Sequence, residues 1–207
     1  KKIPFTITVK NVIVANVNPN GALSVNYGDT QEFTITINSG YKLIKVLVNG
    51  VDKTSEMIAN KLTLTNITSD MTLEVVVEKI TYKVVEGAEQ KYVITKNTKA
   101  KFKIDADYSL FENGGKVYVD GVLLDAKNYK SESGSTIITL NKNYVDTLSN
   151  GEHTLKVVFS DGGEATTKFF VENVKTAVEN PNPSDNIIIY VVTGILSLLG
   201  LTSTMVF

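Results

Sequence analysis

The sequence predicts an all-β chain made of two small antiparallel β modules, followed by one C-terminal transmembrane helix. Hydrophobic and polar residues alternate with a period of two in several short stretches, which is typical of half-buried strands. Asn-Gly and Asp-Gly pairs separate some of these stretches, as they do in β-hairpins. The last part of the chain, residues 187–207, contains no charged side chain, which is typical of a membrane span.

The strand prediction depends on stretches rich in Val, Ile, Thr and aromatic residues, which favour β-structure. Phe33, Ile35 and Ile37 point to one face of a strand, and the polar residues between them point to the other. The same alternation recurs in 73–78 and 154–159. We therefore expect each of these stretches to bury one face in a sheet.

Three hairpin turns are predicted at Asn49-Gly50, Asp120-Gly121 and Asp161-Gly162, because these pairs accept the positive φ of two-residue turns. One short helix is expected over 142–148, with Asn141 as its cap. This density of turns and short strands predicts antiparallel sheets arranged as sandwiches or barrels.

A module boundary is predicted near 79–83, where one long strand ends and a new one begins. The uncharged segment 187–207 is long enough, at roughly 31 Å as a helix, to cross a hydrocarbon core of about 30 Å. The prolines in 179–186 exclude a helix there and indicate an extended linker. The predicted organisation is a first module at 1–80, a second at 81–172, a Pro/Asn linker at 173–186 and a transmembrane helix at 187–207.

The composition excludes several classes of function. Lys and Arg together number 21 against 22 Asp and Glu, and every basic residue is Lys, so no basic face for nucleic acid is indicated. With no Cys, the chain forms no disulfide, thiolate nucleophile or Cys-ligated zinc site. The one histidine, His153, lies on the same face of its predicted strand as Leu155 and Val157, so we expect a packed residue and not a catalytic base. No catalytic residue and no cofactor are predicted, and the chain is interpreted as a non-enzyme.

Two kinds of binding residue were considered. Asp105 and Asp107, with Asp120 or Asp125, offer oxygen ligands for calcium, but the favoured interpretation is solvated loop carboxylates and no metal site. Sugar binding would use exposed aromatic rings, for which we consider Tyr82, Tyr92, Tyr108, Tyr118 and Tyr129. The candidate glycan contacts that we retain are Tyr118 and Tyr129.

The first module resembles the divergent internalin B-type repeat of bacterial surface proteins. The resemblance covers roughly 8–79 and is carried by Tyr27-Gly28, the stretch 39–43, the stretch 46–51 and the closing stretch 62–73. It implies a β-grasp or sandwich-like fold, and it brings no catalytic residues.

The second module resembles the X-type immunoglobulin-like module of clostridial surface and cellulose-degrading proteins. The resemblance covers about 98–172 and is carried by the stretches 117–121, 125–129, 133–140 and 151–162. It implies an immunoglobulin-like sandwich of a kind that usually serves as a spacer or as an auxiliary module, with weak binding to polysaccharide or wall proposed for some of these modules.

The end of the chain resembles the sorting signal of Gram-positive wall proteins, in which a short motif precedes an apolar helix. Pro181 matches the proline of that motif and Ser184-Asp185 match one variant ending, whereas Pro183 stands where the family has Thr. The motif is therefore degenerate. Its residues are Asn180, Pro181, Asn182, Pro183, Ser184 and Asp185. The resemblance implies sortase, peptidoglycan and the membrane as partners.

Two functions follow from these observations. The preferred one is a non-catalytic spacer or stalk of a wall- or membrane-anchored protein on the extracellular face of a bacterial cell envelope, where it displays an N-terminal functional domain. The alternative is a binding module for carbohydrate or host matrix, belonging to a secreted glycoside hydrolase or adhesin. An exposed row of Tyr on one sheet face would distinguish the second function from the first.

Overall fold

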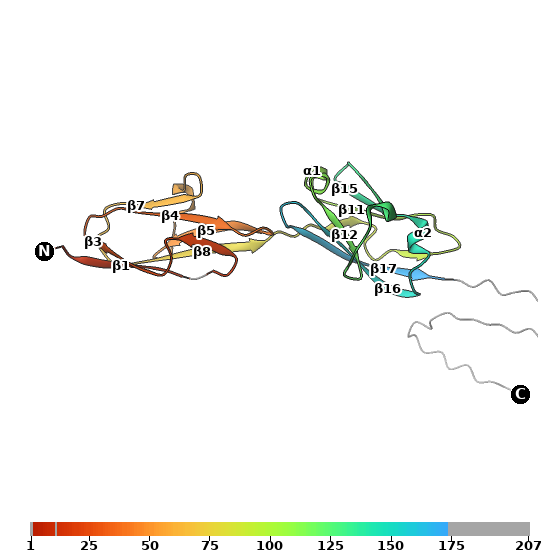
Figure 1. Ribbon diagram of the computed structural model, residues 1–207, viewed down its shortest axis with the longest axis horizontal. Helices are drawn as coiled ribbons and strands as arrows, with labels where there is room; N and C mark the ends of the chain where they lie inside the picture. Colours follow the sequence, from red (N-terminus) through yellow and green to blue (C-terminus); the bar gives the residue numbers. More distant parts are fainter. Residues whose placement is uncertain (1, 11, 174–207) are drawn as a thin grey trace, which may run out of the picture.

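A computed structural model of the chain describes residues 2–10 and 12–173, which form two β-sandwiches joined end to end (Figure 1). We call residues 4–79 the N-terminal sandwich and residues 84–172 the C-terminal sandwich. Each has its own cluster of buried hydrophobic side chains. The residues at the two ends of the described chain lie at opposite ends of this elongated body.

The N-terminal sandwich consists of a five-stranded sheet in the order β3-β1-β8-β5-β6 and a three-stranded sheet in the order β2-β4-β7. It is made of two facing sheets, not a sheet covered by a helix. Its elements are β1 (Pro4–Val9), β2 (Ala15–Asn18), β3 (Ala22–Asn26), β4 (Gln31–Ile37), β5 (Tyr41–Val48), β6 (Val51–Asp52), the 3-10 turn η1 (Thr54–Glu56), β7 (Lys61–Leu64) and β8 (Met71–Lys79).

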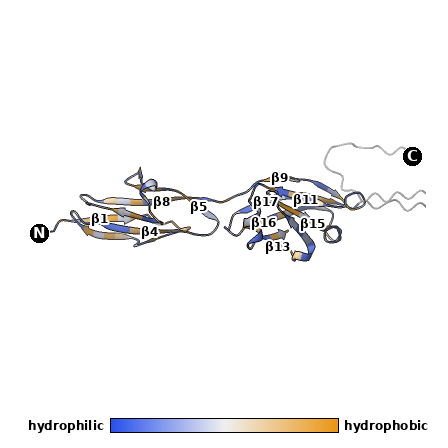
Figure 2. Ribbon diagram, turned by 90° about the horizontal axis from the view of Figure 1, so that it is seen from above, coloured by the Kyte–Doolittle hydropathy of each residue, from blue (hydrophilic) through white to orange (hydrophobic). Residues whose placement is uncertain are grey.

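The core of the N-terminal sandwich follows directly from the alternation in the sequence. Phe33 and Leu62 of the smaller sheet are fully buried, as are Ile7, Val46 and Leu73 of the larger sheet. Apart from Leu47, their neighbours along each strand are polar and reach solvent, so hydrophobic and hydrophilic residues share the same strands (Figure 2). Burial of one face of each sheet drives the two sheets together.

The C-terminal sandwich pairs a five-stranded sheet, β10-β17-β16-β12-β13, with a four-stranded sheet, β14-β15-β11-β9, in an immunoglobulin-like arrangement. Phe102 and Phe169, from opposite sheets, meet edge to face with their ring centroids 5.6 Å apart. Its elements are β9 (Val84–Glu86), β10 (Lys91–Val93), β11 (Ala100–Ile104), α1 (Tyr108–Glu112), β12 (Lys116–Val119), β13 (Val122–Leu123), the 3-10 turn η2 (Ala126–Asn128), β14 (Tyr129–Glu132), β15 (Thr136–Leu140), α2 (Lys142–Val145), β16 (Gly151–Val158) and β17 (Glu164–Glu172).

The prediction of purely antiparallel modules was wrong in one respect. In the N-terminal sandwich β1 pairs in parallel with β8, and in the C-terminal sandwich β10 pairs in parallel with β17. A parallel pair needs a long crossover connection, which here is most of the sandwich itself. Local alternation in the sequence reveals strands but does not reveal a pairing between the first and last strands of a module.

The predicted turns at 49–50 and 120–121 are tight hairpin turns, in which both central residues have positive φ. The connection between β16 and β17 is longer than the predicted two-residue turn, and only Gly162 within it has positive φ. The predicted helix over 142–148 is present but shorter than expected: α2 begins at Lys142 and ends at Val145. The sequence reading missed α1, whose first turn is capped by the Asp107 side chain, an acceptor for the Ser109 amide.

The predicted fold class must also be corrected at its C-terminal end. Among residues 2–10 and 12–173, no helix is long and apolar enough to cross a membrane. The longer of the two described α-helices, α1, has five residues, whereas a span of a bilayer takes about 20. The predicted transmembrane segment 187–207 lies outside the described residues, so the described fold is all-β without it.

Candidate functional site

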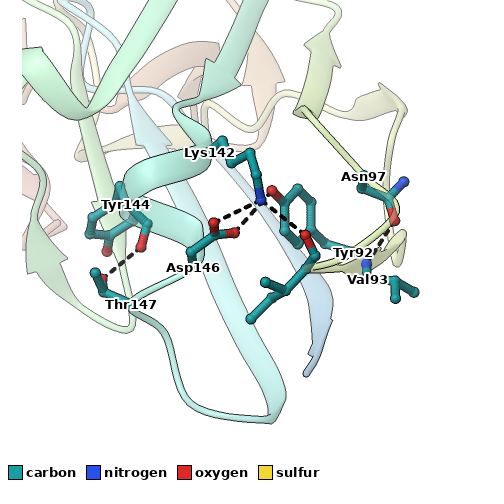
Figure 3. Close-up of polar contacts among 8 residues, drawn as sticks. Tyr92, Val93, Asn97, Lys142, Tyr144, Asp146 and Thr147 are labelled. Atoms are coloured by element: carbon teal, nitrogen blue, oxygen red, sulfur yellow. Dashed lines mark hydrogen bonds and ion pairs between the residues drawn. The ribbon is translucent and has the colours of Figure 1, made fainter. Parts of the chain in front are cut away.

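The polar cluster that most resembles catalytic machinery lies where α2 meets the end of β10 (Figure 3). The Lys142 ammonium donates to Asp146 Oδ2 at 2.7 Å and to the Ile94 carbonyl at 2.9 Å, and it lies 5.9 Å from the centroid of the Tyr92 ring. The Tyr92 hydroxyl donates to the other oxygen of Asp146 at 3.2 Å. The cluster therefore fastens α2 to the β10 end of the sandwich.

The charge states in this cluster oppose nucleophilic chemistry. The hydrogen bond to Asp146 raises the pKa of Lys142, and burial raises the pKa of the Tyr92 hydroxyl. A nucleophilic lysine needs a lowered pKa so that the free amine is present at neutral pH. Lys142 is held as an ammonium, so its arrangement serves structure.

His153 is buried, as its position on the same strand face as Leu155 predicts. Its Nε2 lies 2.9 Å from the Ser149 carbonyl oxygen, which can only accept, so Nε2 carries a hydrogen. Its Nδ1 lies 2.7 Å from Asp120 Oδ2, and Asp120 Oδ1 accepts from the Thr154 amide at 2.8 Å. Burial acts to raise the pKa of Asp120, but these hydrogen bonds outweigh it and lower that pKa. The pair holds the β12–β13 turn onto β16.

The four carboxylates considered for calcium are not brought together. Asp105 accepts from the Lys83 amide at 2.6 Å, Asp107 caps α1, and Asp125 accepts from the Lys127 amide at 3.0 Å. Asp120 pairs with His153. Among the residues that the structure describes, no group of three or more His, Cys, Asp or Glu side chains could hold a metal ion.

The two candidate glycan contacts lie on different sheets. Tyr118 is on β12, on the outer face of the five-stranded sheet, where the Lys156 ammonium lies 5.0 Å from the centroid of its ring. Tyr129 is on β14 of the other sheet and packs against the core, edge to face with Phe111. They therefore do not form a row on one face. The predicted sorting residues 180–185 lie outside the described part of the chain.

The most extensive polar arrangement that the sequence did not predict is the contact between the two sandwiches. We call it the junction: the turn Ser39–Gly40, the connecting residues 79–82 and the loop 161–164. The Gly40 amide donates to the Asp161 carbonyl at 2.8 Å, and the Ile80 amide donates to the Gly40 carbonyl at 2.8 Å. The Ser39 hydroxyl also donates to the Asp161 carbonyl, at 3.2 Å. Backbone hydrogen bonds thus cross from one sandwich to the other.

The connecting residues also join the C-terminal sandwich. Glu164 forms a parallel bridge with Thr81: its amide donates to the Ile80 carbonyl at 3.3 Å, and its carbonyl accepts from the Tyr82 amide at 2.8 Å. The Lys79 ammonium lies 2.8 Å from the Glu164 carboxylate; this hydrogen bond raises the pKa of Lys79 and lowers that of Glu164. The connection is therefore bonded along its length.

A tyrosine fills the centre of the junction. The Tyr82 hydroxyl donates to Asp161 Oδ2 at 2.6 Å, and its ring packs edge to face on Phe159 with the centroids 4.8 Å apart. Asp161 Oδ1 accepts from the Gly163 amide at 2.8 Å, so both carboxylate oxygens are engaged. Burial and the bond to Asp161 raise the pKa of Tyr82 to about 12.

Glycines allow the two sandwiches to approach this closely. A β-carbon on Gly162 would overlap Ser39 and Gly40, reaching within 2.8 Å of the Ser39 carbonyl carbon. A β-carbon on Gly40 would stand 2.8 Å from the Gly162 carbonyl oxygen. Both residues have positive φ, so glycine is required by backbone conformation as well as by space. The sequence predicts a turn at Gly162, but it does not show that this turn meets Gly40.

Comparison with known proteins gives remote structural similarity. No family profile matches the sequence. No curated protein matches it either. A tri-modular GH5 (subfamily 4) endo-β-1,4-glucanase from Bacillus licheniformis is 13% identical with a TM-score of 0.34, covering 76% of this chain and 38% of that one. The Bacteroides ovatus protein SGBP-B, solved in complex with a mixed-linkage heptasaccharide, is 15% identical with a TM-score of 0.31, covering 71% and 42%.

A tandem of titin immunoglobulin domains is 12% identical with a TM-score of 0.29, covering 84% of this chain and 98% of that one. This chain spans about two fifths of the length of the glucanase and of SGBP-B. With identities and TM-scores this low, these similarities carry no function over to this chain.

Proposed function

We propose that the chain is a non-catalytic spacer of a bacterial cell-surface protein, in which the two sandwiches form one stiff unit. The observation that carries the proposal is the hydrogen bond from the Gly40 amide to the Asp161 carbonyl, together with the bonds around it. Contacts between domains of one chain are usually small, so two domains joined by a flexible connection are expected to move independently. Here the residues on both sides of Thr81, Ile80 and Tyr82, are hydrogen-bonded to Gly40 and Glu164, which opposes hinge motion in the connection.

The catalytic alternatives lack support in the described residues. The Lys142 amine in the cluster at α2 is protonated and bonded to Asp146. Both ring nitrogens of His153 are hydrogen-bonded within the fold, one to Asp120 and the other to the Ser149 carbonyl. A spacer needs a fixed length and direction, and the end-to-end arrangement in Figure 1, together with the hydrogen bonds at the junction, supports this role.

The distance between two spin labels, one in each sandwich, tests the proposal. The chain contains no Cys, so two introduced cysteines define the pair without further changes. Thr63 on β7 and Lys101 on β11 are exposed positions suited to Thr63→Cys and Lys101→Cys. We expect a distance distribution as narrow as that of a pair within the C-terminal sandwich, Lys101→Cys with Thr166→Cys. A much broader distribution would contradict the proposal.

A matched pair of glycine variants makes this test specific. Gly162→Ala introduces both a positive-φ alanine and a clash with Ser39, so it should broaden the distribution. Gly121→Ala introduces the same backbone strain, with φ of +79° against +80°, but has nothing within 4 Å of the new methyl group. It should leave the distribution narrow. Equal broadening by both variants would show that the junction does not set the geometry.

A second candidate function is binding of carbohydrate by the outer face of the five-stranded sheet. It is favoured by Tyr118, which pairs across strands with the exposed Leu123 and so places aromatic and aliphatic surface side by side. A sugar that stacked on the ring would have to displace Lys156. Glycan-array binding that is lost in Tyr118→Ala but kept in Tyr27→Ala, a change at an exposed tyrosine of the other sandwich, would establish it. No binding by the wild-type chain would exclude it for the glycans tested.

A further inference from the structure

The first and last strands of the N-terminal sandwich run in parallel, side by side. Ile7, Thr8 and Val9 of β1 lie in register with Met71, Thr72 and Leu73 of β8. Two further bonds extend this contact: the Lys10 amide donates to the Leu73 carbonyl at 2.8 Å, and the Thr6 amide donates to Asp70 Oδ1 at 2.8 Å. The strand that enters this sandwich is thus bonded directly to the strand that leaves it.

The C-terminal sandwich repeats this arrangement in two places along its last strand. At the start of β17, Glu164 bonds in parallel to residues 80–82. Near its end, the Phe170 amide donates to the Gln90 carbonyl at 2.9 Å, and the Ile94 amide donates to the Glu172 carbonyl at 3.0 Å. The entering segment is therefore bonded to the leaving strand at the junction and again through β10.

The direction of these pairs decides how they respond to tension. When the first and last strands are parallel, pulling the chain from its two ends slides one strand along the other. Every hydrogen bond between them is then loaded at once. In an antiparallel pair pulled from adjacent ends, the bonds open one after another, because only the outermost bond carries the load. The same number of bonds therefore resists more force in the first geometry.

Each of these parallel contacts is also crossed by a lysine–glutamate ion pair. Lys10 pairs with Glu74 of β8 at 2.5 Å, and Lys79 pairs with Glu164 at 2.8 Å. Lys91 of β10 pairs with Glu172 of β17. Such surface pairs contribute little to equilibrium stability. In these positions, however, each must break before the strands can slide.

We propose that this chain bears tension along its long axis, with three parallel contacts in series: β1 with β8, residues 80–82 with Glu164, and β10 with β17. The proposal rests on the proposed spacer function and adds that the spacer resists extension. The junction takes part in it, because load that enters the C-terminal sandwich meets the bonds at Glu164 before it reaches β10. The contact that keeps the two sandwiches aligned is thus also a load-bearing contact.

Single-molecule pulling of the full chain tests this proposal. Handles on Lys2→Cys and Asn173→Cys load the chain along its axis, and both positions are outside the paired strands. Handles on Lys42→Cys and Glu78→Cys instead peel β5 from β8, because these residues face each other in an antiparallel pair. Since three residue pairs of β1 and β8 share the load, the axial unfolding force of the N-terminal sandwich should be up to about threefold higher. Equal forces along the two axes would overturn the proposal.

Matched variants locate the resistance. Lys10→Pro removes both the amide hydrogen that bonds to Leu73 and the ion pair with Glu74. Lys10→Ala removes only the ion pair, so the difference between the two variants reports the backbone hydrogen bond. We expect Lys10→Pro to lower the axial force of the N-terminal sandwich clearly and Lys10→Ala to lower it slightly. Val51→Pro disturbs β6, at the sheet edge away from the load, and should lower equilibrium stability without lowering the axial force. An axial force reduced as much by Val51→Pro as by Lys10→Pro would contradict the assignment.

The comparison of pulling axes uses only exposed handle positions, so it still tests the proposal if a proline variant fails to fold. The two experiments also separate a failure of the load-bearing proposal from a failure of the spacer proposal. A narrow spin-label distance with equal forces on both axes would leave a stiff spacer that does not resist extension. A broad distance with a high axial force would leave two load-bearing sandwiches on a flexible joint.

Discussion

The backbone amide of Gly40 donates a hydrogen bond of 2.8 Å to the carbonyl of Asp161, which belongs to the other sandwich. This bond exists because two turns, each able to adopt positive φ at a glycine, meet without side chains between them. Ser39, Ile80 and Glu164 add bonds on either side of it. The fixed relation between the sandwiches therefore depends on backbone geometry more than on a hydrophobic interface.

Hydrogen exchange should show that the junction amides are protected. The amides of Gly40, Ile80 and Glu164 donate within the junction, so they should exchange slowly, although Gly40 and Ile80 lie in connections between strands and Glu164 is the first residue of β17. Gly40→Ala should speed the exchange of Ile80 and Glu164, because its methyl group meets the Gly162 carbonyl oxygen. Gly50→Ala, with similar φ and open space, is the control and should leave these rates unchanged. Wild-type rates typical of an unfolded chain would contradict the bonded junction.

Tyr82→Phe should lower the free energy of unfolding by about 1 kcal/mol, since it removes one side-chain hydrogen bond and keeps the ring packing on Phe159. Urea unfolding at neutral pH measures this change. The stability should also depend on alkaline pH. The unfolded tyrosine loses its proton near pH 10, whereas in the fold Tyr82 keeps it to about 12.

Because the pKa of Tyr82 is raised in the fold, its contribution to stability is complete below pH 10 and is lost as the pH rises from 10 to 12. The wild-type chain should thus lose more stability than Tyr82→Phe over this range. The same alkaline loss in both proteins would show that Tyr82 is not the titrating group.

Asp120→Asn should destabilise the C-terminal sandwich by about 2 kcal/mol, because a charged acceptor for His153 and for the Thr154 amide is replaced by a neutral one. The turn itself should survive, since Asn-Gly accepts the same positive φ, as Asn49-Gly50 does in the other sandwich. Chemical unfolding monitored through the C-terminal sandwich measures the loss.

The acid dependence of the same variant checks the role of the charge. The pKa of Asp120 is lowered in the fold, so its contribution is present above the unfolded value near 3.8 and is lost as the pH falls through the folded value. Asp120→Asn should flatten the loss of stability in this acid range. An unchanged acid profile would assign that loss to other carboxylates.

Lys142 should be among the slower lysines to react with an acylating reagent at mildly alkaline pH. Its pKa is raised, chiefly by the hydrogen bond to Asp146, so less free amine is present. Limited acetylation followed by peptide mass spectrometry ranks the lysines. Asp146→Asn should make Lys142 react faster. Preferential labelling of Lys142 in the wild-type chain would revive a nucleophilic role for this cluster.

The strands and the buried residues were largely predictable, because each strand buries one face and so repeats every two residues. Phe33, Leu73 and Leu155 all lie in the core, on the predicted faces. The parallel pairs were not predictable, since the register of β1 with β8 depends on residues more than 60 positions apart in the chain. Helix α1 was missed because Asp107 was considered as a metal ligand, whereas its side chain caps the helix.

The candidate site was harder to predict than the fold. Asp161-Gly162 was correctly interpreted as a turn signal, but a turn signal does not say what the turn contacts. Similarly, Tyr82 was considered as an exposed aromatic ring, and in the fold it bonds to Asp161. The sequence indicates the turn at Gly162, whereas its contact with Gly40 arises only when both sandwiches have folded.

Residual dipolar couplings of backbone amides in a weakly aligned sample test the central claim most directly, because they report the orientation of each sandwich relative to one common frame. If the junction holds, couplings from β1–β8 and from β9–β17 should fit a single alignment tensor with the same magnitude and axes. Gly162→Ala should separate the two tensors. Two tensors of different magnitude in the wild-type chain would contradict the account, since they would show that the sandwiches reorient independently.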